Sequence, residues 1–139
     1  FDWIQGSLIL TAREDFLNLG GFNTSYPLYF EDTDLCARAA SHSMTIRVEQ
    51  DCRFLHMAGT GSSGSRELRL ACFHWGLVKF FEDHLPRRHF TARSLVILKC
   101  ILRSLALLPV DPCGASGYRM AFRSLLTGIP PRLPERASD

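Results

Sequence analysis

Apolar and polar positions along the chain predict short strands followed by longer helices. Residues 4–10 are apolar around a glycine, which is typical of a buried strand with a close backbone approach. Residues 45–49 alternate between polar and apolar side chains, as a half-buried strand does, and residues 53–56 form a third short candidate. The pattern therefore predicts three short strands, all before residue 57.

Five further segments carry helical signals. A short helix is expected over residues 13–19, ended by Gly20 and Gly21, and another over residues 35–41, capped by Thr33 or Asp34. Residues 66–83 have apolar positions at helical spacing, and residues 91–108 and 116–126 complete the set. The predicted apolar face of the third helix consists of Leu70, Phe73, Leu77, Phe80 and Phe81.

Charge is distributed unevenly over the 139 residues, which have the length of one domain or part of one. Residues 1–83 carry 7 basic and 11 acidic side chains, a net charge of −4, whereas residues 84–139 carry 9 and 3, a net charge of +6. The acidic part suits proton or cation chemistry. The basic part suits an anionic surface such as phospholipid, or is simply a solvated surface. Nucleic acid is not expected as a partner, because the basic residues are not interleaved with aromatic ones.

Cysteine usage and the first residues bear on compartment and completeness. The five cysteines are odd in number and lack a C-x-x-C pair, which favours buried thiols in a reducing compartment. The chain opens without an initiator methionine or a signal-peptide pattern. We therefore expect a cytoplasmic protein, and a chain that begins as if cut from a longer one.

Three carboxylates within four residues form the strongest candidate site. Glu31, Asp32 and Asp34 follow an aromatic run and precede a helical pattern. Crowded carboxylates raise one another's pKa when they are buried, and clefts use such groups as general bases or cation ligands. The alternative is a helix N-terminus that carries acidic residues only because they complement the helix dipole.

A histidine and a small-residue loop follow further along. His56 ends a short apolar segment and precedes a glycine- and serine-rich loop over residues 59–65. A neutral histidine nitrogen is a suitable metal ligand, but a single histidine defines no metal site and is more often a core residue. The loop has the composition of an anion-binding loop and equally that of a flexible linker.

The helix over residues 91–108 has features of a membrane-surface helix. Lys99 and Arg103 form a narrow basic stripe beside a broad apolar arc, an arrangement that suits the interface of a bilayer. The segment is too interrupted for a transmembrane span of about 20 apolar residues. Packing of the apolar arc against another part of the protein is the alternative.

Several motifs, in order, resemble those of family 2 glycosyltransferases of the GT-A type, in the rhamnosyltransferase-like branch. The motifs are D-W-I-Q-G-S at residues 2–7, L-G-G-F-N at 19–23, Y-F-E-D-T-D-L-C-A-R at 29–38, F-L-H-M-A-G-T-G-S at 54–62 and K-F-F-E-D-H at 79–84. The resemblance covers residues 1–85, and the acidic motif is its most specific part. It implies an α/β fold, the C-terminal part of a GT-A domain, with a few short strands and about three helices.

This resemblance also implies a division of the chain and a set of partners. Residues 1–85 would be the acceptor-side, catalytic half of the domain, and residues 86–139 a basic helical extension with a mobile tail. The donor would be a nucleotide sugar, the acceptor a glycan or a lipid-linked glycan, and the expected cofactor a divalent cation, Mg²⁺ or Mn²⁺. A location at the inner face of the membrane would suit such an acceptor.

Site roles follow from the same resemblance. Asp32 would be the catalytic base on the acceptor hydroxyl, with Glu31 supporting it, and His56 would contact the metal or the diphosphate. Trp3 and Gly6 would border the sugar pocket. Asp34 and Arg38 would pair at the start of the helix, with a direct contact to substrate as the alternative. These last four residues complete the expected substrate-binding set.

One departure from the family limits these expectations. No D-x-D motif precedes Trp3, so the donor-binding part of the family pattern is absent from this sequence. We therefore expect no sugar transfer from the 139-residue chain by itself. The alternative function is a non-catalytic remnant that binds a partner or a membrane. An incomplete domain would also leave an exposed apolar edge that favours self-association.

Overall fold

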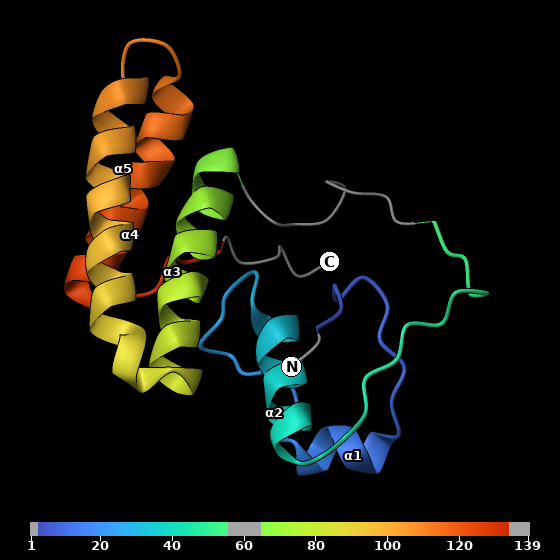
Figure 1. Ribbon diagram of the computed structural model, residues 1–139. Coiled ribbons are helices and arrows are strands. Elements are labelled where there is room, and N and C mark those ends of the chain that lie inside the picture. Colours follow the sequence, from blue (N-terminus) through green and yellow to red (C-terminus); the bar gives the residue numbers. More distant parts are fainter. Residues whose placement is uncertain (1–2, 56–64, 134–139) are drawn as a thin grey trace.

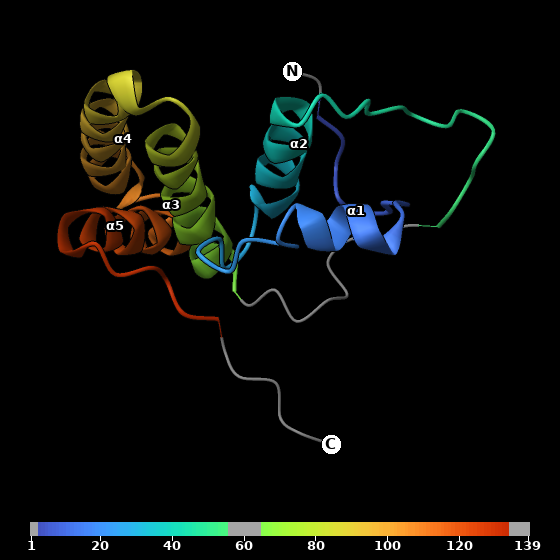
Figure 2. The same cartoon turned by 90° about the horizontal axis from the view of Figure 1, so that it is seen from below.

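Helices and irregular segments make up the computed structural model, which describes residues 3–55 and 65–133 (Figure 1). Both views place α3 between α4 on one side and α2 on the other (Figures 1 and 2). The two short N-terminal helices thus lie on the opposite side of α3 from α4. The helices are α1 (Arg13–Asn18), α2 (Glu31–Ser41), α3 (Arg66–His84), α4 (Pro86–Leu107) and α5 (Pro112–Thr127).

The expected α/β fold is wrong for the described part of the chain. Residues 4–10, 45–49 and 53–55 contain no strand, and the described residues form five helices, where the family resemblance implied about three. A segment becomes a strand only by exchanging backbone hydrogen bonds with a neighbouring strand, and isolated strands are unstable in water. Apolar alternation describes side chains and says nothing about whether such a neighbour exists. The described residues supply none.

The three long helices agree with the sequence pattern because their ends are well marked. Ser65 caps α3, its hydroxyl accepting a hydrogen bond from the Leu68 N–H at 3.3 Å. Asp111 caps α5 in the same way, accepting from the Gly114 N–H at 3.0 Å. Pro86 and Pro112 occupy the first turns of α4 and α5, where the missing N–H costs nothing. Both helices consequently begin several residues earlier than predicted.

Helices α3, α4 and α5 pack together as a bundle with its own apolar core. Helices α3 and α5 approach closely at Gly117, where an added Cβ would lie 3.0 Å from the Cα and the carbonyl oxygen of Glu67. None of the helices within residues 3–55 and 65–133 combines the length and apolarity needed to cross a bilayer. The buried members of the core are Ala71, Val78, Val96, Cys100, Ala121 and Leu125.

A second face of α3 packs against the segment that leads into α2. Tyr26, Ala37 and Phe80 form a smaller buried cluster, with the ring of Phe30 packed against it. Gly76 makes this contact possible, because a Cβ there would lie 2.8 Å from the Phe30 ring and 3.0 Å from the Tyr29 carbonyl oxygen. The single apolar face predicted for this helix is therefore incomplete. Contacts surround α3 on two sides, while Phe73, one of the predicted face, is exposed.

Candidate functional site

The acidic motif begins helix α2 in an unusual backbone conformation. Tyr29 and Phe30 have φ values of +68° and +72°, in the left-handed region that bulky residues rarely adopt. Phe30 is the N-cap and supplies no side-chain hydrogen bond, so the capping role predicted for Thr33 or Asp34 is wrong. All three carboxylates lie in the first turn, where the helix dipole favours them. Backbone strain of this kind is concentrated at functional sites.

Asp32 joins two motifs that are far apart in the sequence. Its Oδ2 accepts a hydrogen bond from the Gly6 N–H at 2.7 Å, and its Oδ1 accepts one from the Thr33 N–H at 2.7 Å. A Cβ on Gly6 would lie 3.0 Å from the Asp32 Cβ and 3.2 Å from Oδ2. Glycine is therefore the residue that allows this close approach. The contact brings the 2–7 and 29–38 motifs together.

Glu31 lies next to Asp32 but in a different environment. One of its carboxylate oxygens, Oε2, is buried and has no hydrogen-bond partner among residues 3–55 and 65–133. Burial raises the pKa of the Glu31 carboxyl, and the negative charge of Asp32 raises it further. The hydrogen bond from the Glu31 backbone N–H acts in the opposite direction and lowers this pKa. Neighbouring carboxyls in unlike environments are typical of acid–base sites.

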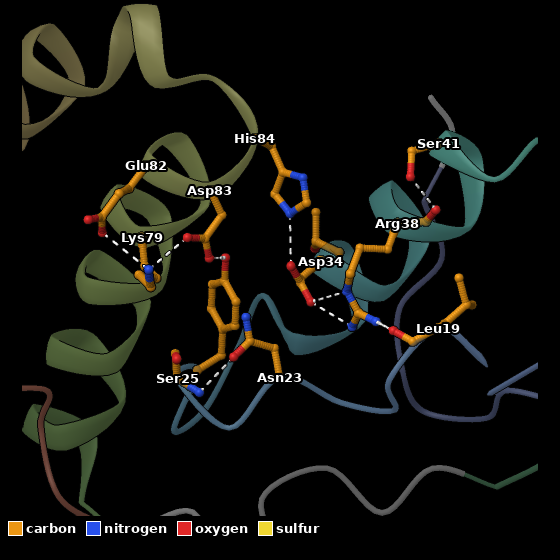
Figure 3. Close-up of polar contacts among 12 residues, drawn as sticks. Leu19, Asn23, Ser25, Asp34, Arg38, Ser41, Lys79, Glu82, Asp83 and His84 are labelled. Carbon is orange, nitrogen blue, oxygen red and sulfur yellow. Dashed lines mark hydrogen bonds and ion pairs between the residues drawn. The ribbon is translucent and has the colours of Figure 1, made fainter. Parts of the chain in front are cut away.

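Asp34 is almost fully buried and forms a polar network with two partners (Figure 3). Its Oδ2 accepts from Nε and Nη2 of Arg38, at 2.9 and 2.7 Å. Its Oδ1 lies 2.8 Å from Nε2 of His84, at the end of α3. A carboxylate can only accept, so Nε2 carries the hydrogen in this contact. Only 1% of the Asp34 surface is exposed, and both of its carboxylate oxygens are engaged by Arg38 and His84.

Arg38 extends the same network to the turn after α1. Its Nη1 donates to the Leu19 carbonyl oxygen, and its Nη2 donates to that of Gly21 at 2.8 Å. Gly20 and Gly21 have φ values of +84° and +69°, which explains why glycines end α1 as predicted. Asp34 and Arg38 thus form the expected pair at the start of α2. Through Arg38, this pair also holds the turn at residues 19–21 that follows α1.

His84 was not among the predicted site residues. The signal that could have revealed it is Phe80-x-x-x-His84, one helical turn apart, within a segment that already resembled the family. The two rings lie against each other with centroids 4.6 Å apart. This contact aims the His84 imidazole at Asp34.

A second polar contact links the two sides of the molecule (Figure 3). The buried Tyr26 hydroxyl donates to Asp83 Oδ2 at 2.9 Å, and Lys79 lies 2.7 Å from the other Asp83 oxygen. Burial, together with the hydrogen bond and charge of Asp83, raises the pKa of Tyr26 far above its ordinary value. No sequence spacing predicts this contact, because the residues are far apart in the chain.

Two predicted site residues remain, Trp3 and His56. Trp3 lies near Gly6 in the chain and has 57% of its surface exposed. His56 lies outside the described residues. Within residues 3–55 and 65–133, no group of three or more His, Cys, Asp or Glu side chains is arranged to hold a metal ion. The expected divalent cation is therefore assigned to none of these residues.

Comparison with known proteins gives one partial match. The rhamnosyltransferase WbbL of Escherichia coli (strain K12) is 30% identical over 93 residues, which are 67% of this chain and 34% of that protein. The chain thus spans about a third of the length of this relative. No family model matches the chain, and no solved structure matches it. The similarity indicates a glycosyltransferase-like region in the chain.

Proposed function

We propose that this chain carries the acceptor side of an inverting glycosyltransferase that uses a nucleotide-sugar donor. The proposal refines the glycosyltransferase-like similarity to a family 2, rhamnosyltransferase-like reaction with a glycan or lipid-linked acceptor. The observation that carries it is the hydrogen bond between Gly6 and Asp32. Two motifs of the family resemblance, separated by more than twenty residues, meet at this contact.

Asp32 is proposed as the catalytic base. Its carboxylate would take the proton of an acceptor hydroxyl while the oxygen attacks the anomeric carbon of the donor sugar. The bond between that carbon and the nucleoside diphosphate would break as the new bond forms, which inverts the configuration. Glu31, with a raised pKa and a buried free oxygen, supports this site as the neighbouring proton acceptor. No step is assigned to a metal ion.

Asp34, Arg38 and His84 are proposed as positioning residues. Asp34 bonds to groups on α2 and α3, and Arg38 reaches the turn at residues 19–21. This network fixes the first turn of α2, and with it the direction of the Asp32 side chain. An error of about 1 Å in the placement of a base is enough to cost about 100-fold in rate.

The test is sugar transfer by the natural polypeptide that carries this sequence, with a nucleoside-diphosphate rhamnose as the first donor. Release of the nucleoside diphosphate measures turnover. Asp32→Asn should lower kcat by roughly 10²- to 10⁴-fold, the usual loss when a general base is removed. Asp15→Asn removes an exposed carboxylate from α1 and serves as the matched control. Its kcat should equal that of the wild type.

Two results would contradict the proposal. Equal turnover by the wild type and Asp32→Asn would assign the base to another residue. No transfer with any nucleotide sugar would leave the alternative, a non-catalytic module that binds a partner. The exposed apolar residues of the N-terminal part, Leu8, Leu10, Val48, Phe54 and Leu55, give that alternative a concrete surface.

A further inference from the structure

Helix α4 is apolar on two opposite faces, and the bundle uses one of them. Val96 and Cys100 point into the core and are buried. On the opposite side, Leu95, Leu102 and Leu105 keep 61%, 58% and 65% of their surfaces exposed. A helix that is apolar on both sides needs a second apolar environment. Figures 1 and 2 place α4 on the side of the bundle away from α1 and α2, so no other described helix covers this face.

Basic side chains border the exposed leucines. Lys99 and Arg103 line the same surface depression as Leu95, Leu98 and Leu102 on the outer side of α4. Arg87 and Arg88 are exposed at the start of the helix. None of these four cations forms a salt bridge among the described residues. Residues 84–110 contain no aspartate or glutamate, so this part of the surface is uniformly positive.

We propose that this outer face of α4 binds the surface of an anionic phospholipid bilayer. A helix lying in the interface buries its apolar residues about 5–10 Å deep and keeps its basic residues at the level of the headgroups. The leucines of α4 fit the first requirement. Lys99 and Arg103 beside them fit the second. The uniform positive charge favours anionic lipid as the occupant over a second copy of this face, which would bring like charges together. The inference does not depend on the proposed transferase activity.

The experiment is vesicle flotation with the natural chain. We expect it to bind vesicles in which phosphatidylcholine is mixed with phosphatidylglycerol, to bind phosphatidylcholine alone weakly, and to be released by high salt. Replacing both Lys99 and Arg103 with glutamine should weaken binding to the mixed vesicles about 30-fold, at roughly a factor of five per lost charge. Replacing Leu95 and Leu102 with serine should weaken binding to both kinds of vesicle.

A matched control removes two charges elsewhere. Arg47→Gln with Arg53→Gln changes the net charge equally, on an exposed segment that lies across the molecule from α4 (Figures 1 and 2). This variant should bind as the wild type does, and circular dichroism should show that all variants keep their helices.

Three outcomes would overturn the inference. The first is a folded wild type that does not float with the mixed vesicles. The second is an equal loss of binding in the control variant, because general charge would then suffice. The third is a wild type that forms oligomers, binds no vesicles, and becomes monomeric when Leu95 and Leu102 are replaced. That result would make the face an interface between protein chains.

Discussion

The bundle of α3, α4 and α5 and the N-terminal part, residues 3–55, are stabilised in different ways. Small apolar side chains and a helical glycine let the three long helices approach closely around one core. In the N-terminal part, the buried apolar cluster is small and several large apolar residues are exposed. Ionic and hydrogen-bonded side chains, above all Asp34, connect it to α3.

This difference explains why the candidate catalytic residues lie where they do. Helix α3 of the bundle provides the support for the segment that carries the acidic motif. The acidic motif is held on that support by Phe30, which packs against Gly76, and by His84, which contacts Asp34. Tyr29 and Phe30, whose φ values lie in the left-handed region, lead directly into the first turn of α2, which carries the three carboxylates. The core of the bundle is apolar, whereas the candidate site in the first turn of α2 is polar.

The largest expected effect comes from removing the buried carboxylate. Asp34→Asn leaves Arg38 without its counter-charge and leaves one acceptor oxygen where Arg38 and His84 now use two. Breaking a buried ion pair in this way should lower the free energy of unfolding by about 3 kcal/mol, measured by urea denaturation. Hydrogen exchange should show lost protection in α2 and little change in α4 and α5, because the bundle core is untouched.

The control for this variant is Asp51→Asn, which removes an exposed carboxylate from the same part of the chain. Its stability should lie within about 0.5 kcal/mol of the wild type. Equal loss of protection in α2 and α5 after Asp34→Asn would show that the two parts unfold as one unit. The conclusion that the bundle and the N-terminal part are stabilised in different ways would then be incorrect.

A smaller effect, in the opposite region, is expected from Gly117→Ala. The added Cβ would lie 3.0 Å from backbone atoms of Glu67 and from the Leu70 side chain, so α3 and α5 would have to separate. Overpacking costs about 1–3 kcal/mol, and the better helix propensity of alanine returns up to about 1 kcal/mol. We expect a net loss of about 1 kcal/mol in the free energy of unfolding, with exchange increased in α5.

Arg119→Ala, at an exposed position of the same helix, is the matched control and should change stability by less than about 0.5 kcal/mol. A stabilised Gly117→Ala variant would mean that the helices have room to move apart. The close packing inferred for the bundle would then be incorrect.

Sequence reasoning was most successful where local signals mark a helix. The third, fourth and fifth helices were predicted from their apolar periodicity, and the structure places their starts at local signals such as the cap Ser65 and Pro86. The strands at 4–10 and 45–49 were wrong because strand formation depends on a partner that the segment itself does not encode. Periodicity thus predicted the helices, because the backbone hydrogen bonds of a helix lie within the segment itself.

The candidate site was predictable in part for the same reason. Asp34 and Arg38 are four residues apart on one helix, so their pairing follows from helical geometry. The contact of Gly6 with Asp32 and that of His84 with Asp34 join distant segments, and no local rule predicts them. The roles assigned to Trp3 and His56 stay predictions. Contacts between segments are the information that the sequence pattern lacks.

The smallest effect, and the sharpest in its pH dependence, concerns Tyr26. Tyr26→Phe removes the hydroxyl that is bonded to Asp83, while Asp83 keeps Lys79 as a partner. The free energy of unfolding should therefore fall by about 1 kcal/mol near neutral pH. Because burial raises the pKa of Tyr26, the folded protein keeps this proton above about pH 10, where the unfolded chain releases it. Wild-type stability should therefore fall relative to the variant by about 1.4 kcal/mol per pH unit above about pH 10, so the difference vanishes about one unit higher. Tyr29→Phe, at an exposed tyrosine nearby, is the control. If the wild type kept the same excess of unfolding free energy over Tyr26→Phe across this pH range, the Tyr26 hydroxyl would not be buried.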